Sequence, residues 1–200
     1  MYNHKNGIIL RKIEEYDLNF LLDLKKESWW GTHSTLIINE LDQKKWFDSI
    51  PNNHLFMMAE NLEKEKLGVG IYTDIDWISR SLKISGSIEK KYRSKYAEIS
   101  FCAGLDFAFE ILNMNRVEAE VLDYHIMAQK IEIQLLGFKV EGCKRKSVYK
   151  SGKYYDSYIL GILREEWENC DRIKKYEHSC NTNFDHTFFE KLKKRSIITN

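Results

Sequence analysis

The chain has 200 residues, of which 43% are hydrophobic and 13% aromatic, with 31 Lys and Arg against 30 Asp and Glu. A formal net charge of +1 is too balanced for a protein that binds nucleic acid through bulk electrostatics, and charged residues at 30% argue against a membrane protein. Ten glycines and a single proline exclude a linker-rich chain, so the composition predicts one compact domain, or one domain with a tail.

The N-terminus and the cysteines bear on the cellular compartment. The first apolar stretch, residues 8–10, is broken at once by Arg11, so we expect neither a signal peptide nor a membrane span, and therefore a cytoplasmic protein. No C-x-x-C pair occurs among the cysteines, so we predict free thiols and no metal site for Cys102, Cys143, Cys170 and Cys180.

In the first half of the chain, the spacing of apolar residues predicts helices between strands. Alternation favours a strand at residues 7–13, followed by an amphipathic helix that begins near Glu14 and ends at residues 29–33. A second helix starts after Asn39 and stops at Pro51, whose missing N–H and fixed φ oppose continuation. The next three strands are consecutive and predict an antiparallel meander, at residues 54–60, 67–74 and 81–88.

A helix between two strands dominates the second half. Residues 96–112 have the apolar positions of a buried helix and residues 117–122 alternate as a strand, which predicts a βαβ-like unit with a right-handed crossover. A further helix over residues 126–136 ends at Gly137. Extended segments then flank a hairpin turn, at residues 138–142, 149–154 and 155–163. We place the domain at residues 1–167 and a tail at residues 168–200, in which residues 184–192 have the spacing of an amphipathic helix.

Several segments of the second half share their order and spacing with the GNAT acyltransferases. They are residues 107–110, 115–121, 136–142, 152–156 and 163–167. From about residue 8 to residue 167 the chain therefore resembles the branch of that superfamily that contains ribosomal-protein, polyamine and amino-sugar N-acetyltransferases. The resemblance implies a GNAT-like α/β fold, with a mixed, mostly antiparallel sheet flanked by helices, and acetyl-CoA as the acyl donor.

A looser resemblance concerns the acceptor. Residues 45–50 and 68–77 are similar to the N-acetyltransferases that modify a nucleotide-linked 4-amino-4,6-dideoxy sugar in the pseudaminic-acid pathway, although residues 25–30 lack the Trp-Arg-Asn signature of that group. The implied partner is a small-molecule primary amine, preferably of a nucleotide-linked amino sugar, with no nucleic acid and no membrane. A polyamine, a drug amine or a protein N-terminus stays open as acceptor, as do a homodimer and a catalytically inactive binding module on the same fold.

The resemblance puts the acyl-CoA site at the end of the strand over residues 81–88 and at the start of the next helix. A strand that splays from its neighbour would end at Ile88, and helix N-termini offer unpaired N–H groups that suit phosphate. The family loop reads Arg/Gln-x-x-Gly-x-Gly/Ala, and its central glycine is missing here. We expect charged side chains to compensate, with a solvated basic turn as the alternative, in the segment Arg93, Ser94, Lys95, Tyr96 and Ala97.

Transfer to an amine requires a group that accepts the proton of the amine and one that protonates the leaving thiolate. Many members of the family use a tyrosine four residues before the Gly-Phe pair, where this chain has Ile133, and residues 123–137 are one residue longer than usual. We therefore predict acid and base work for His125, with a water-exposed histidine at a helix start as the alternative. Tyr124 would donate to the thiolate, and Ser87 would order a water or contact the thioester, unless that serine is only structural.

The acceptor site is expected between the first two helices, at Trp29, Trp30, Thr32 and His33. Paired tryptophans stack on a nucleotide base or a sugar face, although either is also an ordinary core residue. Asp74 and Asp76 would pair with a cationic amine or with hydroxyls. The same Asp-x-Asp before Trp77 is also typical of a turn cap.

Overall fold

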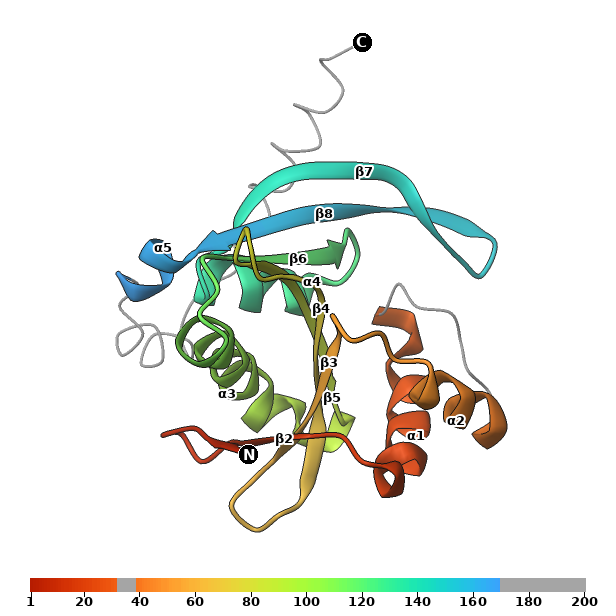
Figure 1. The fold of residues 1–200 in the computed structure, drawn as a ribbon. Coiled ribbons are helices and arrows are strands. Elements are labelled where there is room, and N and C mark those ends of the chain that lie inside the picture. The colour runs from red at the N-terminus through yellow and green to blue at the C-terminus, as the bar shows by residue number, and fades with distance from the viewer. Residues whose placement is uncertain (32–38, 170–200) are drawn as a thin grey trace.

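The computed structural model of the chain describes residues 1–31 and 39–169. These residues form an eight-stranded sheet in the order β1-β2-β3-β4-β5-β6-β8-β7, with helices on both faces (Figure 1). Neighbouring strands are antiparallel, except that β5 and β6 run parallel. The mixed, mostly antiparallel α/β architecture expected from the sequence is confirmed.

The strands are β1 (Tyr2–Asn3), β2 (Ile9–Lys12), β3 (Leu55–Glu60), β4 (Lys66–Asp76), β5 (Ser81–Ile88), β6 (Arg116–Leu122), β7 (Lys139–Lys150) and β8 (Lys153–Leu163). The α-helices are α1 (Leu18–Ser28), α2 (Glu40–Asp48), α3 (Arg93–Asp106), α4 (Ile126–Gln129) and α5 (Arg164–Glu168). Short 3-10 helices are η1 (Glu15–Asp17), η2 (Trp29–Gly31) and η3 (Lys90–Tyr92), and π-helical turns are η4 (Phe107–Ile111) and η5 (Lys130–Leu135).

Several boundaries differ from expectation for local reasons. The strand expected at residues 138–142 continues to Lys150, because β7 and β8 form one long hairpin that turns at Ser151 and Gly152, both with positive φ. The helix expected at residues 96–112 already begins at Arg93 and finishes as the π-helical turn η4. Strand β1 has only two residues, too few for a periodic pattern.

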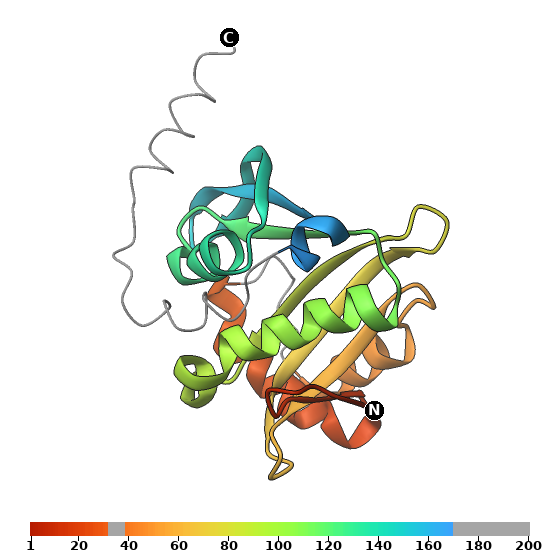
Figure 2. The same cartoon turned by 90° about the vertical axis from the view of Figure 1, so that its left-hand side faces the viewer.

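The two faces of the sheet bury their side chains in two separate cores. Along β3, Met57 and Ala59 enter the core that includes Leu105 of α3, whereas Met58 between them enters the core that includes Leu21 of α1, because successive side chains of a strand point to opposite faces. Figure 2 shows α3 lying across the strands on one face, and Figure 1 shows α1 and α2 on the other. At roughly 1.5–3 kcal/mol for each large apolar side chain buried, these cores hold the helices on the sheet.

The parallel pairing of β5 and β6 is short. It joins Ser81 to Arg116, Leu82 to Val117 and Lys83 to Glu118, and stops there. Beyond that point β6, β8 and β7 run across the direction of β3 to β5 (Figure 1). Ser85 and Gly86 are consequently exposed although they lie inside a strand at the centre of the sheet. The sheet therefore opens between β5 and β6.

A buried ion cluster fastens the start of α1 to the sheet. Arg11 donates to both carboxylate oxygens of Asp17 (2.7 and 2.9 Å) and, through Nε, to Glu60 of β3 (2.8 Å). The Lys66 ammonium lies 2.8 Å from the same Asp17, whose side chain is 0% exposed. Burial alone raises the pKa of Asp17, but the hydrogen bonds from Arg11 and Lys66 outweigh it and hold this pKa at about 2.

The last described helix belongs to the core. Trp167 of α5 is 1% exposed and its indole N–H donates to Asp106 (2.8 Å), which also bonds His4 near the N-terminus (2.8 Å). Residues 170–200, which include nearly all of the expected tail, lie outside the described residues. No helix within the described ranges is long and apolar enough to cross a membrane.

Replacement of Asp17 by Asn should destabilise the protein by about 3 kcal/mol, because it leaves Arg11 and Lys66 without their shared counter-ion in a buried site. Urea unfolding at pH 7 measures the loss, with Asp23→Asn on the exposed side of α1 as control. Because the folded pKa lies below the ordinary value of 3.8, the advantage of the wild type is complete above pH 4 and shrinks as the pH falls towards 2. A difference that stays constant over this range would contradict the assignment.

Candidate active site

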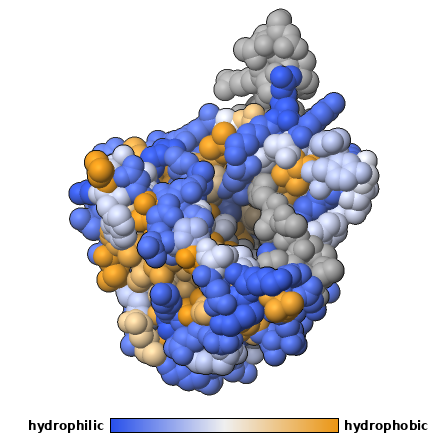
Figure 3. All heavy atoms as spheres, turned by 45° about the vertical axis from the view of Figure 1, so that its right-hand side comes forward, coloured by the Kyte–Doolittle hydropathy of each residue, from blue (hydrophilic) through white to orange (hydrophobic). Residues whose placement is uncertain are grey.

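Two cavities meet where the sheet opens. The first, of about 420 Å³, lies on the face covered by α3 and is lined by Tyr72, Ser94, Ala97 and Ser100 among others. The second, of about 370 Å³, lies on the face covered by α1 and α2 and is lined by Lys25, Gln43, Trp46 and Phe56 among others. We call them the α3-side cavity and the α1-side cavity. Figure 3, which brings forward the side where α1 and α2 lie, shows apolar side chains inside a hollow with a mostly hydrophilic rim.

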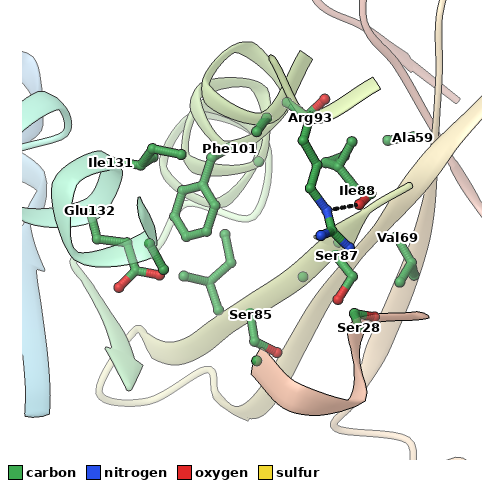
Figure 4. A pocket seen from close by; sticks show the side chains of 18 of the residues that line it. Ser28, Ala59, Val69, Ser85, Ser87, Ile88, Arg93, Phe101, Ile131 and Glu132 are labelled. Atoms are coloured by element: carbon green, nitrogen blue, oxygen red, sulfur yellow. Dashed lines mark hydrogen bonds between the residues drawn. The ribbon is translucent and has the colours of Figure 1, made fainter. Parts of the chain in front are cut away.

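The two cavities share a junction at β5 and at the segment of α4 and η5. The residues that line both are Ser28, Gly31, Val69, Ile84, Ser85, Gly86, Ser87, Phe101, His125, Ala128 and Glu132. Figure 4 shows Glu132, Ile131 and Phe101 on the helical side of the cavity, across from Ser85 and Ser87 on β5. A molecule entering from one face of the sheet would therefore reach a molecule entering from the other face at this junction.

Glu132 is the most unusual group at the junction. Its side chain is buried, and Oε2 has no hydrogen-bond partner among the residues that the structure describes. Burial raises the pKa of this carboxyl from 4.5 to about 8. An ionisable group with a pKa near neutrality, in a cavity, is typical of catalytic sites because it both holds and releases a proton there.

The π-helical turn explains why the sequence did not point to Glu132. In η5 the Leu136 N–H donates to the Ile131 carbonyl (2.9 Å), five residues back, so the turn absorbs one residue more than an α-helix does. Glu132 consequently lines the cavities, whereas Ile133 packs against the core. The available signals were the extra residue in segment 123–137 and the isolated carboxylate between two isoleucines.

The mouth of the α3-side cavity holds an internal anion. The carboxylate of Glu27 accepts hydrogen bonds from the Lys90 N–H (2.7 Å) and from Arg93 Nη2 (2.9 Å). Arg93 also donates through Nε to the carbonyl of Ile88 (2.8 Å), so it joins the end of β5 to the end of α1. The Lys90 N–H and the Arg93 guanidinium could therefore bind an anion here, and in this structure the anion that they bind is the Glu27 carboxylate.

The loop before α3 needs no glycine. Between Arg80 and Asn113, a stretch described throughout, every residue has a negative φ, and η3 closes with a hydrogen bond from the Tyr92 N–H to the Glu89 carbonyl (2.8 Å). At the place where the GNAT loop pattern has a glycine, this chain has an ordinary 3-10 turn.

Of the cofactor residues expected from the sequence, Ile88, Arg93, Ser94 and Ala97 line the α3-side cavity. Lys95 and Tyr96 do not line it, and the Lys95 ammonium lies 4.7 Å from the centre of the Tyr96 ring. The buried Ser100 hydroxyl, which the sequence did not indicate, lines the same cavity without a hydrogen-bond partner among the described residues.

The three expected catalytic residues differ in position. His125 and Ser87 line the junction. The His125 ring lies against Gly31, where a Cβ would come within 3.0 Å of Cε1, so this glycine leaves room for it. Tyr124 lines neither cavity, because its hydroxyl donates to the Trp30 carbonyl (2.5 Å). Burial also raises the pKa of Tyr124, which keeps the phenol protonated.

The expected acceptor residues are mostly elsewhere. Trp30 lines the α3-side cavity and packs on Tyr124, whereas Trp29 lines neither cavity and lies beside the Lys150 ammonium (4.6 Å). Thr32 and His33 lie outside the described residues.

Asp74 and Asp76 also line neither cavity, so the structure does not bring them to the place where we propose the acceptor site. Asp74 pairs with Lys83 (2.8 Å), and Asp76 caps the β4–β5 turn by accepting from the N–H groups of Ile78 (2.8 Å) and Ser79 (3.0 Å). The turn-cap alternative therefore describes Asp76. Both aspartates lie at the end of β4 that is away from the junction.

Known structures share this architecture. The chain superposes with a TM-score of 0.77 on the spermidine N-acetyltransferase of Vibrio cholerae in complex with CoA and spermine, at 21% identity over 82% of this chain and 100% of that one. A dodecameric structure of spermidine N-acetyltransferase from the same organism, in an intermediate state, gives a TM-score of 0.71 at 23% identity over 82% and 98% of the two chains. The protein thus has the fold of these acetyltransferases, as the resemblance to the GNAT superfamily predicted.

At the level of sequence the likeness is more limited. The chain is 30% identical over 77 residues to the uncharacterized N-acetyltransferase YnaD of Bacillus subtilis (strain 168). This match spans 38% of the chain and 45% of the length of that relative. No protein-family model matches the chain.

The raised pKa of Glu132 predicts a stability difference that depends on pH. The folded protein keeps a proton on Glu132 that the unfolded chain loses, so wild-type stability falls relative to Glu132→Gln as the pH rises from 4.5 to 8. At pH 8 the variant should be more stable by roughly 4 kcal/mol in urea unfolding, and at pH 4 the two should be alike. Glu110→Gln on an exposed position controls for the loss of one acidic group. A pH-independent difference would contradict the raised pKa.

Proposed function

We propose that this protein is an N-acetyltransferase that moves an acetyl group from acetyl-CoA to a primary amine. The observation that carries the proposal is the junction of two cavities from opposite faces of the sheet, at the opening between β5 and β6 and beside the carboxyl of Glu132. Donor and acceptor thereby enter by separate routes and meet in an orientation set by the backbone. A cytoplasmic location and a small-molecule partner are part of the proposal.

The α3-side cavity fits an acyl-CoA. The edge of β5 left without a strand neighbour at residues 84–88 offers backbone groups to an extended pantetheine arm, and the first turn of α3 offers N–H groups to phosphate. Arg93, Ser94 and the unpartnered hydroxyl of Ser100 add side-chain donors. Acetyl-CoA supplies the acyl group as a thioester. The V. cholerae enzyme with the same fold, in complex with CoA, supports this choice of donor.

Glu132 holds the proton that the reaction moves. In acetyl transfer the amine nitrogen loses a proton and the thiolate gains one, so a single carboxyl at the junction serves both needs. With a pKa of about 8, Glu132 carries a proton on most molecules at pH 7. Glu132 donates this proton to the leaving thiolate and then accepts the proton that the amine nitrogen loses. The carboxyl is thereby protonated again. His125 lines the same junction and is the second candidate for this work.

The acceptor enters from the α1-side cavity. Trp46 and Phe56 meet there edge to face (4.9 Å between ring centroids, 87°), which suits the face of a sugar or a base. The amine of a nucleotide-linked amino sugar is our preferred acceptor. A polyamine is the alternative, supported by the V. cholerae enzyme in complex with spermine.

A non-catalytic binding module is the competing function, and one observation favours it. Glu27 occupies the Lys90 N–H and Arg93, the donors on which a phosphate would bind. Calorimetric titration with CoA, combined with thiol release from acetyl-CoA and a panel of amino sugars, polyamines and peptides, separates the two. Binding with turnover supports the transferase, and absence of binding at millimolar CoA rejects it.

Replacement of Glu27 by Gln should tighten the binding of CoA by about threefold to fivefold, because an exposed ion pair contributes no more than about 1 kcal/mol and its loss frees Arg93 for phosphate. Calorimetry gives the dissociation constant directly. The neighbouring Asp23→Asn, which changes an exposed carboxylate on the same helix, should leave it unchanged. Weaker binding by the Glu27 variant would show that this carboxylate organises the loop rather than competing with the ligand.

Replacement of Glu132 by Gln should lower kcat about 100-fold, the usual loss when a general acid or base is removed, while the dissociation constant for CoA changes little. In pH profiles of kcat, the Gln variant should lose the limb near pH 8, and His125→Asn should keep it. The reverse result, in which only His125→Asn loses that limb, would assign the proton transfer to the histidine.

A further inference from the structure

The part of the α1-side cavity that is not shared with the α3-side cavity has a chemistry of its own. It is lined by Lys25 on α1, by Gln43 and Trp46 on α2, and by Phe56 on β3. None of these residues belongs to the junction, so they bear on what the acceptor carries besides its amine. The inference below rests on the proposed function and concerns the acceptor alone.

The side-chain oxygen of Gln43 is buried without a described hydrogen-bond donor. It is 2% exposed, yet its side-chain oxygen makes no hydrogen bond within the described part of the chain. A buried carbonyl oxygen left unpaired costs about 1–3 kcal/mol, so such groups are generally satisfied by protein, water or ligand. A hydroxyl or N–H group of a molecule in the cavity would satisfy it.

Lys25 is a cation without a counter-ion. It is half-buried and makes no ion pair with any described residue, and its ammonium lies 6.0 Å from the centre of the Trp46 ring. The next residue, Lys26, is exposed and lines neither cavity, and its ammonium lies 3.8 Å from a carboxylate oxygen of Asp23. Burial lowers the pKa of Lys25, which is the behaviour of an ammonium that lacks a nearby negative charge.

The carboxylates that face the same cavity do not neutralise Lys25. Glu120 accepts from the Lys144 ammonium (2.5 Å) and from the Ser157 hydroxyl (2.5 Å), so its charge is already balanced. Glu132 carries a proton at neutral pH, as its raised pKa requires. Lys25 is thus the charged side chain that faces this space without a counter-ion in the described ranges, and a polycation would be repelled by it.

We infer that Lys25, Gln43 and the Trp46–Phe56 pair form a subsite for an anionic group, so that the acceptor is an amine that also carries a carboxylate or a phosphate. The anion pairs with the Lys25 ammonium, the aromatic pair contacts the apolar frame of the molecule, and Gln43 accepts from one of its hydroxyl or N–H groups.

Matched pairs of amines test the subsite. Glucosamine 6-phosphate and glucosamine differ by a phosphate, 4-(aminomethyl)benzoate and benzylamine differ by a carboxylate, and spermidine represents the polycations. In wild type, the anionic member of at least one pair should bind at least tenfold more tightly by calorimetry, and should have the higher kcat/KM. Whichever pair shows the preference identifies phosphate or carboxylate as the group recognised.

Variants then assign the preference. Lys25→Met should abolish it, Lys25→Glu should reverse it in favour of spermidine, and Lys26→Met should leave it intact. Equal affinity within both pairs, a preference that survives Lys25→Met, a wild-type preference for spermidine, or no binding by any probe at 10 mM would each overturn the inference. Because affinity is measured without donor, and CoA binding to the α3-side cavity is measured separately, these results stand apart from failure of the proposed transferase function.

Discussion

The rest of the site depends on the point where β5 and β6 stop pairing. A parallel ladder of three residue pairs holds the two strands together at one end, and beyond it no strand of the described ranges closes the space between them. A sheet normally separates the molecules bound on its two faces. Here the interruption connects the cavities on the α3 side and the α1 side through the centre of the sheet. Strands β6, β7 and β8 remain attached through that short ladder and through the core that they share with α3.

Two buried acidic groups show how neighbouring donors decide the chemistry of a carboxyl. Asp17 and Glu132 are both removed from water, and burial alone would raise the pKa of each. Asp17 receives hydrogen bonds and charge from Arg11 and Lys66 and stays ionised, so it serves as a structural anchor. Glu132 receives none at Oε2 from the described residues and keeps its proton near neutral pH. The cost of burying a carboxylate is offset by Arg11 and Lys66 at Asp17. It is not offset at Glu132, which lines both cavities.

Much of the fold could be predicted from the sequence, because periodic patterns report on local structure. Pro51 predicted the end of a helix, which stops three residues earlier at Asp48, residues 67–74 and 81–88 predicted an antiparallel pair, and the order of later segments indicated the fold. The site was harder to predict from the sequence because it depends on contacts between residues that are far apart along the chain. The bond from Lys90 to Glu27 joins positions 63 apart, and no local pattern encodes it. Asp74 has a suitable carboxylate but lies at the end of β4 that is away from the junction. Its residue type did not show where along the strand the cavity would be.

The π-helical turn at η5 bears on how this segment tolerates the insertion or deletion of a residue. A single inserted residue in a regular helix would rotate everything after it by about 100°. The wide turn instead takes up one residue more than an α-helix does, and Gly137 and β7 follow directly after it. A residue gained or lost within such a turn would therefore change which side chain faces the cavities, the place that Glu132 holds, without rotating the strand that follows.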